Sequence, residues 1–146
     1  MNTWRRLTDR RMTAFVDTSG LYALLDRDDA FHERAGTCWR DLSEQQAPLV
    51  THNYVLVETI ALTHRRLGPV AVRVLKDDVF PVISVFWVDE GLHNAAMTAL
   101  IAAARQDISL VDWVSFEAMR LRGVQRAFTF DRHFLDQGFT VLPGIP

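Results

Sequence analysis

Short apolar runs of β-forming residues alternate along this chain with longer segments that carry helix signals. The runs predicted to be strands are residues 13–17, 48–51, 83–89, 125–130 and 140–143. The segments predicted to be helical are 18–29, 28–46, 53–67, 68–80, 90–106 and 110–123, with a short helical turn at 131–138. Strands separated by helices pair in parallel through right-handed crossovers, and continuous apolar strands are covered on both faces. The pattern therefore predicts a three-layer α/β/α sandwich with a mostly parallel central sheet.

The size and composition of the chain fit a single domain. It has 146 residues, of which 49% are apolar, and it contains no repeat or Ser/Gly-rich linker. We expect the domain to span residues 12–146. Residues 1–11 are polar, precede the first predicted strand and are followed by a second possible start, Met12, so we expect this tail to be dispensable.

Charge, cysteine content and hydropathy exclude several classes of protein. The formal net charge is −2, so any nucleic acid must bind through a local basic patch. A single cysteine, Cys38, excludes an internal disulfide framework and favours a reducing cytosol. The longest apolar runs have ten residues, whereas a bilayer needs about 20. We therefore expect a cytoplasmic protein without a membrane span.

Two acids follow predicted strands directly. Asp17 ends the run "TAFVD", and Asp131 follows "AFTF". Because sites in open α/β sheets form outside the carboxyl ends of the strands, these acids are expected on one rim of the sheet. Each has an ordinary alternative as a turn or helix-capping residue, since aspartate favours both positions.

Two further acids lie within predicted helices. Glu58 is surrounded by apolar residues in "VLVETIALT", and a buried carboxylate is costly unless it is paired or coordinated. Its alternative is to reach solvent or to pair with Arg65 or Arg66. Asp112 stands three residues after Ser109, so a capping box would also explain it.

Three stretches together resemble a known family. They are "FVDTSGLYALLDRDD", "VETIALTHRR" and "SLVDWVSFEAMRLRGVQRAFTFDRHF". They resemble the PIN-domain ribonucleases, most closely the VapC-type toxins of toxin–antitoxin pairs, and the resemblance covers residues 13 to about 142. It implies that the catalytic, metal-binding acids are Asp17, Glu58, Asp112 and Asp131, none of which is substituted. It further implies an RNA substrate, a homodimer and a cognate antitoxin protein.

The chemistry of four clustered carboxylates agrees with that implication. Such a cluster persists only if it binds a cation or takes up protons. Oxygen ligands favour Mg²⁺ or Mn²⁺, and the five histidines form no zinc motif. The expected reaction is metal-assisted hydrolysis of RNA phosphodiester bonds. We expect the hydroxyls of Thr18, Ser19 and Thr129 to hold the acids, although capping would also explain them. His133, in "FDRHF", is expected to be structural or to lie beside the substrate.

Cations near the same rim are needed for contact with RNA. The candidates are Arg65, Arg66, Arg120, Arg122, Arg126 and Arg132, although arginines at helix ends also complement the helix dipole. Two other functions stay open, a housekeeping PIN-domain RNA-processing nuclease and a non-catalytic RNA- or protein-binding domain of the same fold. An aspartyl phosphotransferase is disfavoured because Ser19 stands where its second acid is needed.

Overall fold

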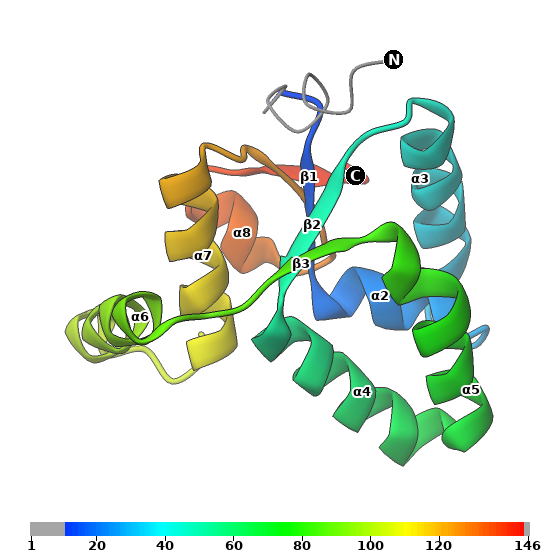
Figure 1. Cartoon of the computed structure of the whole chain (residues 1–146), viewed down its shortest axis with the longest axis horizontal. Coiled ribbons are helices and arrows are strands. Elements are labelled where there is room, and N and C mark those ends of the chain that lie inside the picture. The colour runs from blue at the N-terminus through cyan, green and yellow to red at the C-terminus, as the bar shows by residue number, and fades with distance from the viewer. Residues whose placement is uncertain (1–10, 145–146) are drawn as a thin grey trace.

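A computed structural model describes residues 11–144, and five short strands form its centre (Figure 1). They are β1 (Ala14–Val16), β2 (Leu49–His52), β3 (Ser84–Phe86), β4 (Arg126–Phe128) and β5 (Thr140–Leu142). Their order in the sheet is β3-β2-β1-β4-β5, and every neighbouring pair is parallel. The predicted α/β architecture with a parallel central sheet is confirmed.

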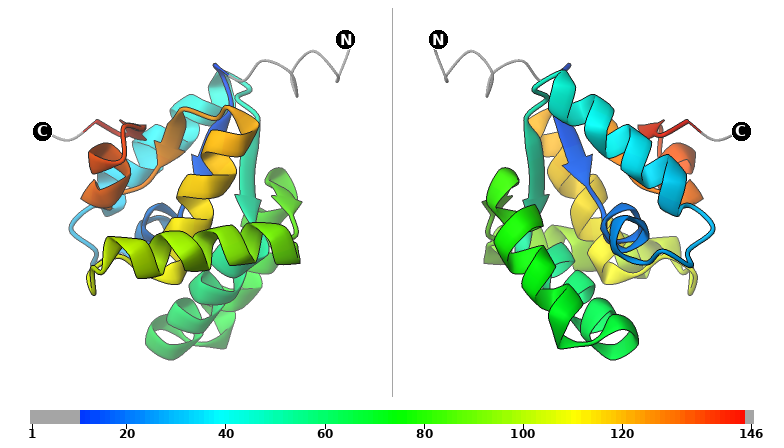
Figure 2. Two further views of the ribbon diagram at one scale, coloured as in Figure 1. Left: turned by 90° about the vertical axis from the view of Figure 1, so that its left-hand side faces the viewer. Right: turned by 90° about the vertical axis from the view of Figure 1, so that its right-hand side faces the viewer.

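Helices lie on both sides of this sheet. They are α2 (Thr18–Leu25), α3 (His32–Glu44), α4 (Asn53–Leu67), α5 (Pro69–Val74), α6 (Glu90–Ala103), α7 (Leu110–Arg122) and α8 (Arg132–Asp136). Helices α6 and α7 lie on one side and α2 and α3 on the other, as the two side views in Figure 2 show. Helix α4 extends below the ends of the strands in Figure 1 and packs against α2 and α5. No helix within residues 11–144 is long and apolar enough to cross a membrane.

The order of the strands places a switch point between β1 and β4. From β1 the chain proceeds to β2 and β3 on one side, whereas β4 and β5 lie on the other side of β1. The connections after β1 and before β4 therefore run on opposite sides of the sheet. Such an arrangement leaves a crevice beyond the carboxyl ends of the two neighbouring strands, where ligand sites form in this class of fold.

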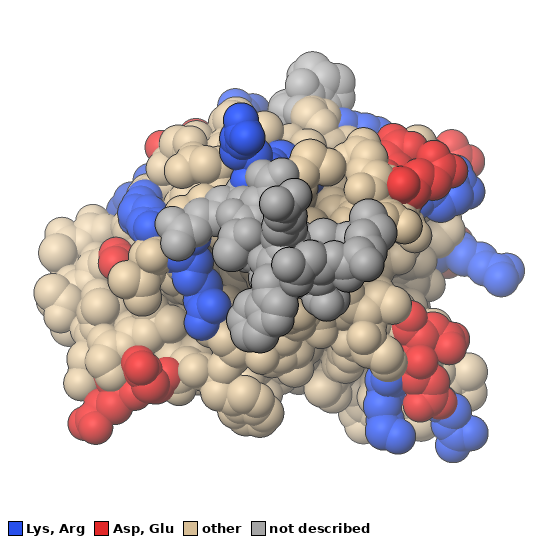
Figure 3. Space-filling view, turned by 45° about the horizontal axis from the view of Figure 1, so that its top comes forward, with Lys and Arg blue, Asp and Glu red and all other residues tan. Residues whose placement is uncertain are grey.

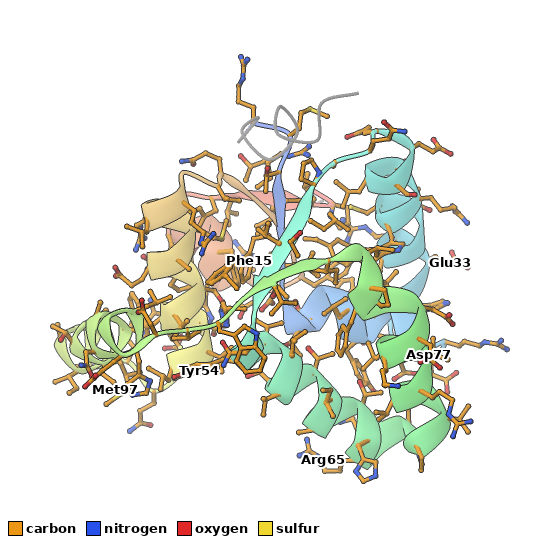
Figure 4. The ribbon with its side chains drawn as sticks, viewed as in Figure 1. Phe15, Glu33, Tyr54, Arg65, Asp77 and Met97 are labelled. Carbon is orange, nitrogen blue, oxygen red and sulfur yellow. The ribbon has the colours of Figure 1, made fainter. Side chains whose placement is uncertain are left out.

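Aromatic side chains fill the space on both faces of β1 and β4. Phe15 lies at the centre of the molecule (Figure 4), and its ring centroid is 6.2 Å from that of Phe134. On the opposite face the ring of Phe128 is 5.5 Å from that of Trp39. Phe128 also abuts Gly20, where an added Cβ would lie 2.8 Å from its carbonyl oxygen. Because both of its faces are covered, the central strand β1 consists of apolar, buried residues only.

Most predicted helices are shorter in the structure, and two of them end early for a visible reason. The helix predicted over 68–80 ends at Val74 and continues as a π-helical turn (Leu75–Val79) and a 3₁₀ turn (Phe80–Val82). Pro81 lacks a backbone N–H and disfavours helix before it, so the α-helix cannot continue. Helix α6 ends at Ala103 rather than at 106, because Ala104 adopts a left-handed conformation with φ of 51°.

Candidate active site

Asp17 follows β1 and is 3% exposed. It occupies the N-cap position of α2, but its side chain does not cap the helix. Its Oδ2 atom instead accepts hydrogen bonds from Ser19 Oγ and Thr129 Oγ1, each at 2.9 Å. The two hydroxyls predicted to hold this acid do so, and the capping alternative does not describe its side chain.

The same hydroxyl pair links the ends of β1 and β4. Ser19 Oγ and Thr129 Oγ1 are 3.0 Å apart, and Thr129 Oγ1 accepts the backbone N–H of Asp131 at 3.0 Å. This network fixes Asp17 and Asp131 relative to one another. Thr18 differs from our expectation, because its hydroxyl contacts no acid and accepts a hydrogen bond from Thr59 at 3.0 Å. That bond joins α2 to α4 beside Glu58.

Asp112 lies in the first turn of α7, where it belongs to the helix cap and also lies near the other acids. Its backbone N–H donates to Ser109 Oγ at 3.2 Å, as in the predicted helix cap. The pKa of Asp112 is nevertheless raised to about 7, mainly by burial and then by the charges of Asp17, Asp131 and Glu58, although the backbone of Ser109 lowers it. A carboxylate that only capped a helix would have a lowered pKa. Burial among the other acids therefore has a larger effect on the pKa of Asp112 than the helix cap has.

The pKa of Asp17 shows the same crowding. It is raised to about 6, mainly by burial and also by the charges of Asp131 and Glu58, although the hydroxyls of Thr129 and Ser19 lower it. Glu58 therefore lies close enough to Asp17 and Asp112 for its charge to raise both pKa values. The structure brings together all four predicted acids, Asp17, Glu58, Asp112 and Asp131.

The two arginines considered as partners of Glu58 have other positions. The guanidinium of Arg66 lies over the ring of Tyr22, 5.6 Å from its centroid. Arg65 lies at the end of α4 remote from the sheet (Figure 4). The alternative in which Glu58 is neutralised within its own helix therefore has no support from these positions.

Asp131 caps α8 and also contacts His133, which the sequence placed near the substrate but not among the metal-binding residues. Its Oδ1 atom accepts the backbone N–H of His133 at 2.9 Å, and the ring Nδ1 of His133 lies 2.9 Å from the same oxygen. Burial opposes the charged form of His133, but Asp131 and Asp107 outweigh it and raise its pKa. Within the described chain, Asp112, Asp131 and His133 each offer a ligand atom within 4.8 Å of the others. In the sequence, the spacing "D-x-H" of Asp131 and His133 was the signal that could have indicated this pair.

The predicted RNA-contacting arginines are divided between two ends of the molecule. Arg126 begins β4 whereas Asp131 follows it, so Arg126 lies at the opposite end of the sheet, where it donates to the carbonyl of Met12. Arg122 ends α7 far from Asp112, and its guanidinium lies 3.9 Å from the ring centroid of Phe86. On the end where β1 begins, small groups of acidic and basic side chains, several of them side by side, lie on a largely uncharged surface (Figure 3). Arg132 is exposed beside the cluster, so it is the best placed of the six.

Comparisons with known proteins agree with this geometry. The family model described as PIN domain matches residues 14–139. The 23S rRNA-specific endonuclease VapC20 of Mycobacterium tuberculosis is 36% identical over 126 residues, which cover 86% of this chain and 94% of VapC20. The crystal structure of that protein, described as a sarcin–ricin loop cleaving toxin, superposes with a TM-score of 0.78 at 34% identity. It covers 87% of this chain and 96% of its own.

More distant structures share the fold alone. FitAcB from Neisseria gonorrhoeae matches with a TM-score of 0.63 at 14% identity, covering 88% of this chain and 95% of its own. PAE2754 from Pyrobaculum aerophilum matches with a TM-score of 0.57 at 19% identity, covering 92% of this chain and 91% of its own. These two proteins therefore share the fold with this chain although their sequences are only 14% and 19% identical to it.

Proposed function

Since this chain belongs to the PIN-domain family, we propose that it is a metal-dependent endoribonuclease. Its catalytic and metal-binding acids are Asp17, Glu58, Asp112 and Asp131. The observation that carries the proposal is the gathering of these carboxylates at the switch point of the sheet, where burial first and then the charges of the neighbouring acids raise the pKa values of Asp17 and Asp112 to about 6 and 7. A fold tolerates this cost where a cation offsets it.

The donor atoms present fit a divalent cation. Carboxylate oxygens are ligands for Mg²⁺ and Mn²⁺, and the cluster contains no thiolate. A cation bound there supplies an activated water and stabilises the leaving oxygen of a phosphodiester. Ser19 and Thr129 hold Asp17 in one orientation, and the start of α7 holds Asp112 opposite it. These contacts keep the acids converged before any ligand arrives.

The substrate is RNA, and Arg132 is the cation proposed to contact its phosphates. Arg132 is exposed and adjoins Asp131, so a phosphate at the acidic cluster would lie within reach of its guanidinium. The identity with VapC20 over nearly the whole domain narrows the substrate further. We propose that this chain is the toxin of a toxin–antitoxin pair, that it forms a homodimer, and that it cleaves 23S rRNA at the sarcin–ricin loop, like the relative it resembles.

Mapping RNA ends tests this function. Intact ribosomes are incubated with the protein and Mn²⁺ or Mg²⁺, and new 5′ ends in 23S rRNA are located by primer extension. We expect one dominant cut in the sarcin–ricin loop. Asp17→Asn should abolish it, while Asp77→Asn, at an exposed ion pair with Lys76, should leave it unchanged.

Two results would change the proposal. Metal-dependent cuts in other RNAs, with 23S rRNA intact, would replace the substrate and favour an RNA-processing nuclease. If neither ribosomal nor free RNA were cut, but the protein still bound RNA, the chain would be a non-catalytic binding domain of this fold.

A further inference from the structure

His133 lies at the edge of the acidic cluster, and its two ring nitrogens face different carboxylates. Nε2 lies 3.1 Å from Oδ2 of Asp107, in the loop before α7. Nδ1 lies 2.9 Å from Oδ1 of Asp131. The side chain is 21% exposed, but the Nδ1 atom itself is buried. The ring is therefore held between an outer and an inner carboxylate.

The outer carboxylate determines which nitrogen carries the hydrogen. Arg105 donates to both oxygens of Asp107, at 3.0 Å from Nε and 2.6 Å from Nη2. Because a guanidinium only donates, both oxygens of Asp107 act as acceptors in this pair. Nε2 of His133 is then the donor, and Nδ1 is left to face the cluster.

The inner nitrogen has the surroundings of a metal ligand. Within residues 11–144, Nδ1 has no hydrogen-bond partner, although Asp131 Oδ1 is only 2.9 Å away. Oδ1 already accepts the backbone N–H of His133. Two neighbouring ligands of an octahedral ion, each about 2.1 Å from it, are about 3 Å apart. The observed separation therefore fits two atoms that share one cation, and an oxygen of Asp112 lies within 4.8 Å of both.

We propose that Nδ1 of His133 is a ligand of the bound cation, beside the carboxylates of Asp112 and Asp131. The inference rests on the metal-dependent function proposed above and deepens it. A metal-bound histidine commonly donates its other ring N–H to a carboxylate, which fixes the orientation of the ring, and Asp107 occupies that place here. The sequence predicted ligands of oxygen only. A nitrogen ligand shifts the preference of the site from Mg²⁺ towards Mn²⁺ and the later first-row ions.

Pulsed EPR of Mn²⁺ bound to the full-length protein tests this directly. Mn²⁺ is added to metal-free protein prepared with ¹⁴N- or ¹⁵N-histidine. We expect a nitrogen coupling that changes with the isotope and disappears in His133→Gln, whose amide can still reach Asp107. The same variant should bind Mn²⁺ at least about 10-fold more weakly, while its affinity for Mg²⁺ changes less than about 3-fold. His64→Gln, at an exposed position of α4, is the control and should change neither.

The outcomes separate this inference from the function on which it rests. Bound Mn²⁺ without nitrogen coupling, and with the same affinity in His133→Gln, would overturn the ligand assignment and leave the carboxylate site intact. Failure of the protein to bind Mn²⁺ at all would overturn both. Asp107→Asn should retain the coupling and weaken Mn²⁺ binding about 10-fold, because the ring loses its orienting acceptor. Unchanged affinity in that variant would show that Asp107 does not orient His133.

Discussion

Replacing Asp112 with asparagine distinguishes a cluster carboxylate from a helix cap, because the two roles predict opposite effects on stability. A cap alone would lose a favourable charge–dipole interaction of about 0.3–1 kcal/mol. If Asp112 is instead a carboxylate buried among other acids, the substitution removes an unfavourable charge and should stabilise the metal-free fold. The pKa of Asp112 rises from 3.8 to about 7, and each unit corresponds to about 1.36 kcal/mol, so ionising Asp112 costs the fold about 4 kcal/mol.

The sign follows from proton binding. Between about pH 4 and 7 the folded state holds a proton on Asp112 that the unfolded state has released. The stability contributed by this group is therefore greatest near pH 4 and is lost as the pH rises to 7. Allowing for the lost cap and for relaxation, we expect metal-free Asp112→Asn to be more stable than the wild type by about 1–3 kcal/mol at pH 8. At pH 4 the difference should be near zero.

The assay is urea unfolding of the metal-free wild type and variant at pH 4, 6 and 8. The difference between the two proteins is the informative quantity, because burial lowers the pKa of His52 to about 4 and gives the wild type an opposing pH dependence. Glu117→Gln on the same helix, beside Arg120, is the matched control and should show no such trend. Mn²⁺ at about 100 times its Kd should stabilise the wild type by about 2.7 kcal/mol and the Asp112 variant far less. An Asp112 variant less stable than the wild type at pH 8, with Mn²⁺ stabilising both equally, would refute the reasoning.

Three further predictions concern the scaffold around the site. In urea unfolding, Gly20→Ala should destabilise the fold by about 1–3 kcal/mol, because its Cβ would clash with Phe128. Gly36→Ala, in α3 with open space around it, should stabilise the fold by about 0.5–1 kcal/mol. Equal effects of the two substitutions would contradict this. Thr129→Val removes a hydroxyl that lowers the pKa of Asp17, so more of this carboxyl would be protonated at pH 6 than in the wild type. RNA cleavage by the variant should therefore fall more at pH 6 than at pH 8, and an equal fall at both pH values would contradict this. A chain starting at Met12 should keep the melting temperature of the full chain, and a loss of several degrees would show that the preceding residues, most of which lie outside the described range, are docked.

The sequence was most informative where local patterns coincide with the fold. The helix predicted over 53–67 matches α4. Its apolar residues, its first residue and the glycine after its last residue, Gly68, all indicate the same helix. The rim positions of Asp17 and Asp131 followed from the rule that parallel strands end together. Asp112 could not be resolved in this way, since a cap and a cluster residue have the same local sequence and only the tertiary structure brings the other acids close.

Contacts between distant segments were the part that could not be predicted. His133 interacts with Asp107, 26 residues earlier, across the gap between α8 and the loop before α7. The sequence placed a helix up to residue 106, so Asp107 looked like an ordinary polar residue after a helix. The expected position of Arg126 near the acidic rim was wrong for a related reason. Arg126 is close to Asp131 along the chain, but β4 lies between them. The two residues are therefore at opposite ends of the sheet.

The dependence of RNA cleavage on added metal tests the central claim most directly. The protein is treated with EDTA, dialysed, and titrated with Mn²⁺ while the initial rate of 23S rRNA cleavage is measured. If the four carboxylates form a metal-dependent nuclease site, cleavage is absent without metal and returns in a saturable way as Mn²⁺ is added. Cleavage at an undiminished rate in EDTA, unchanged by Mn²⁺, would contradict the claim and point to chemistry without a metal.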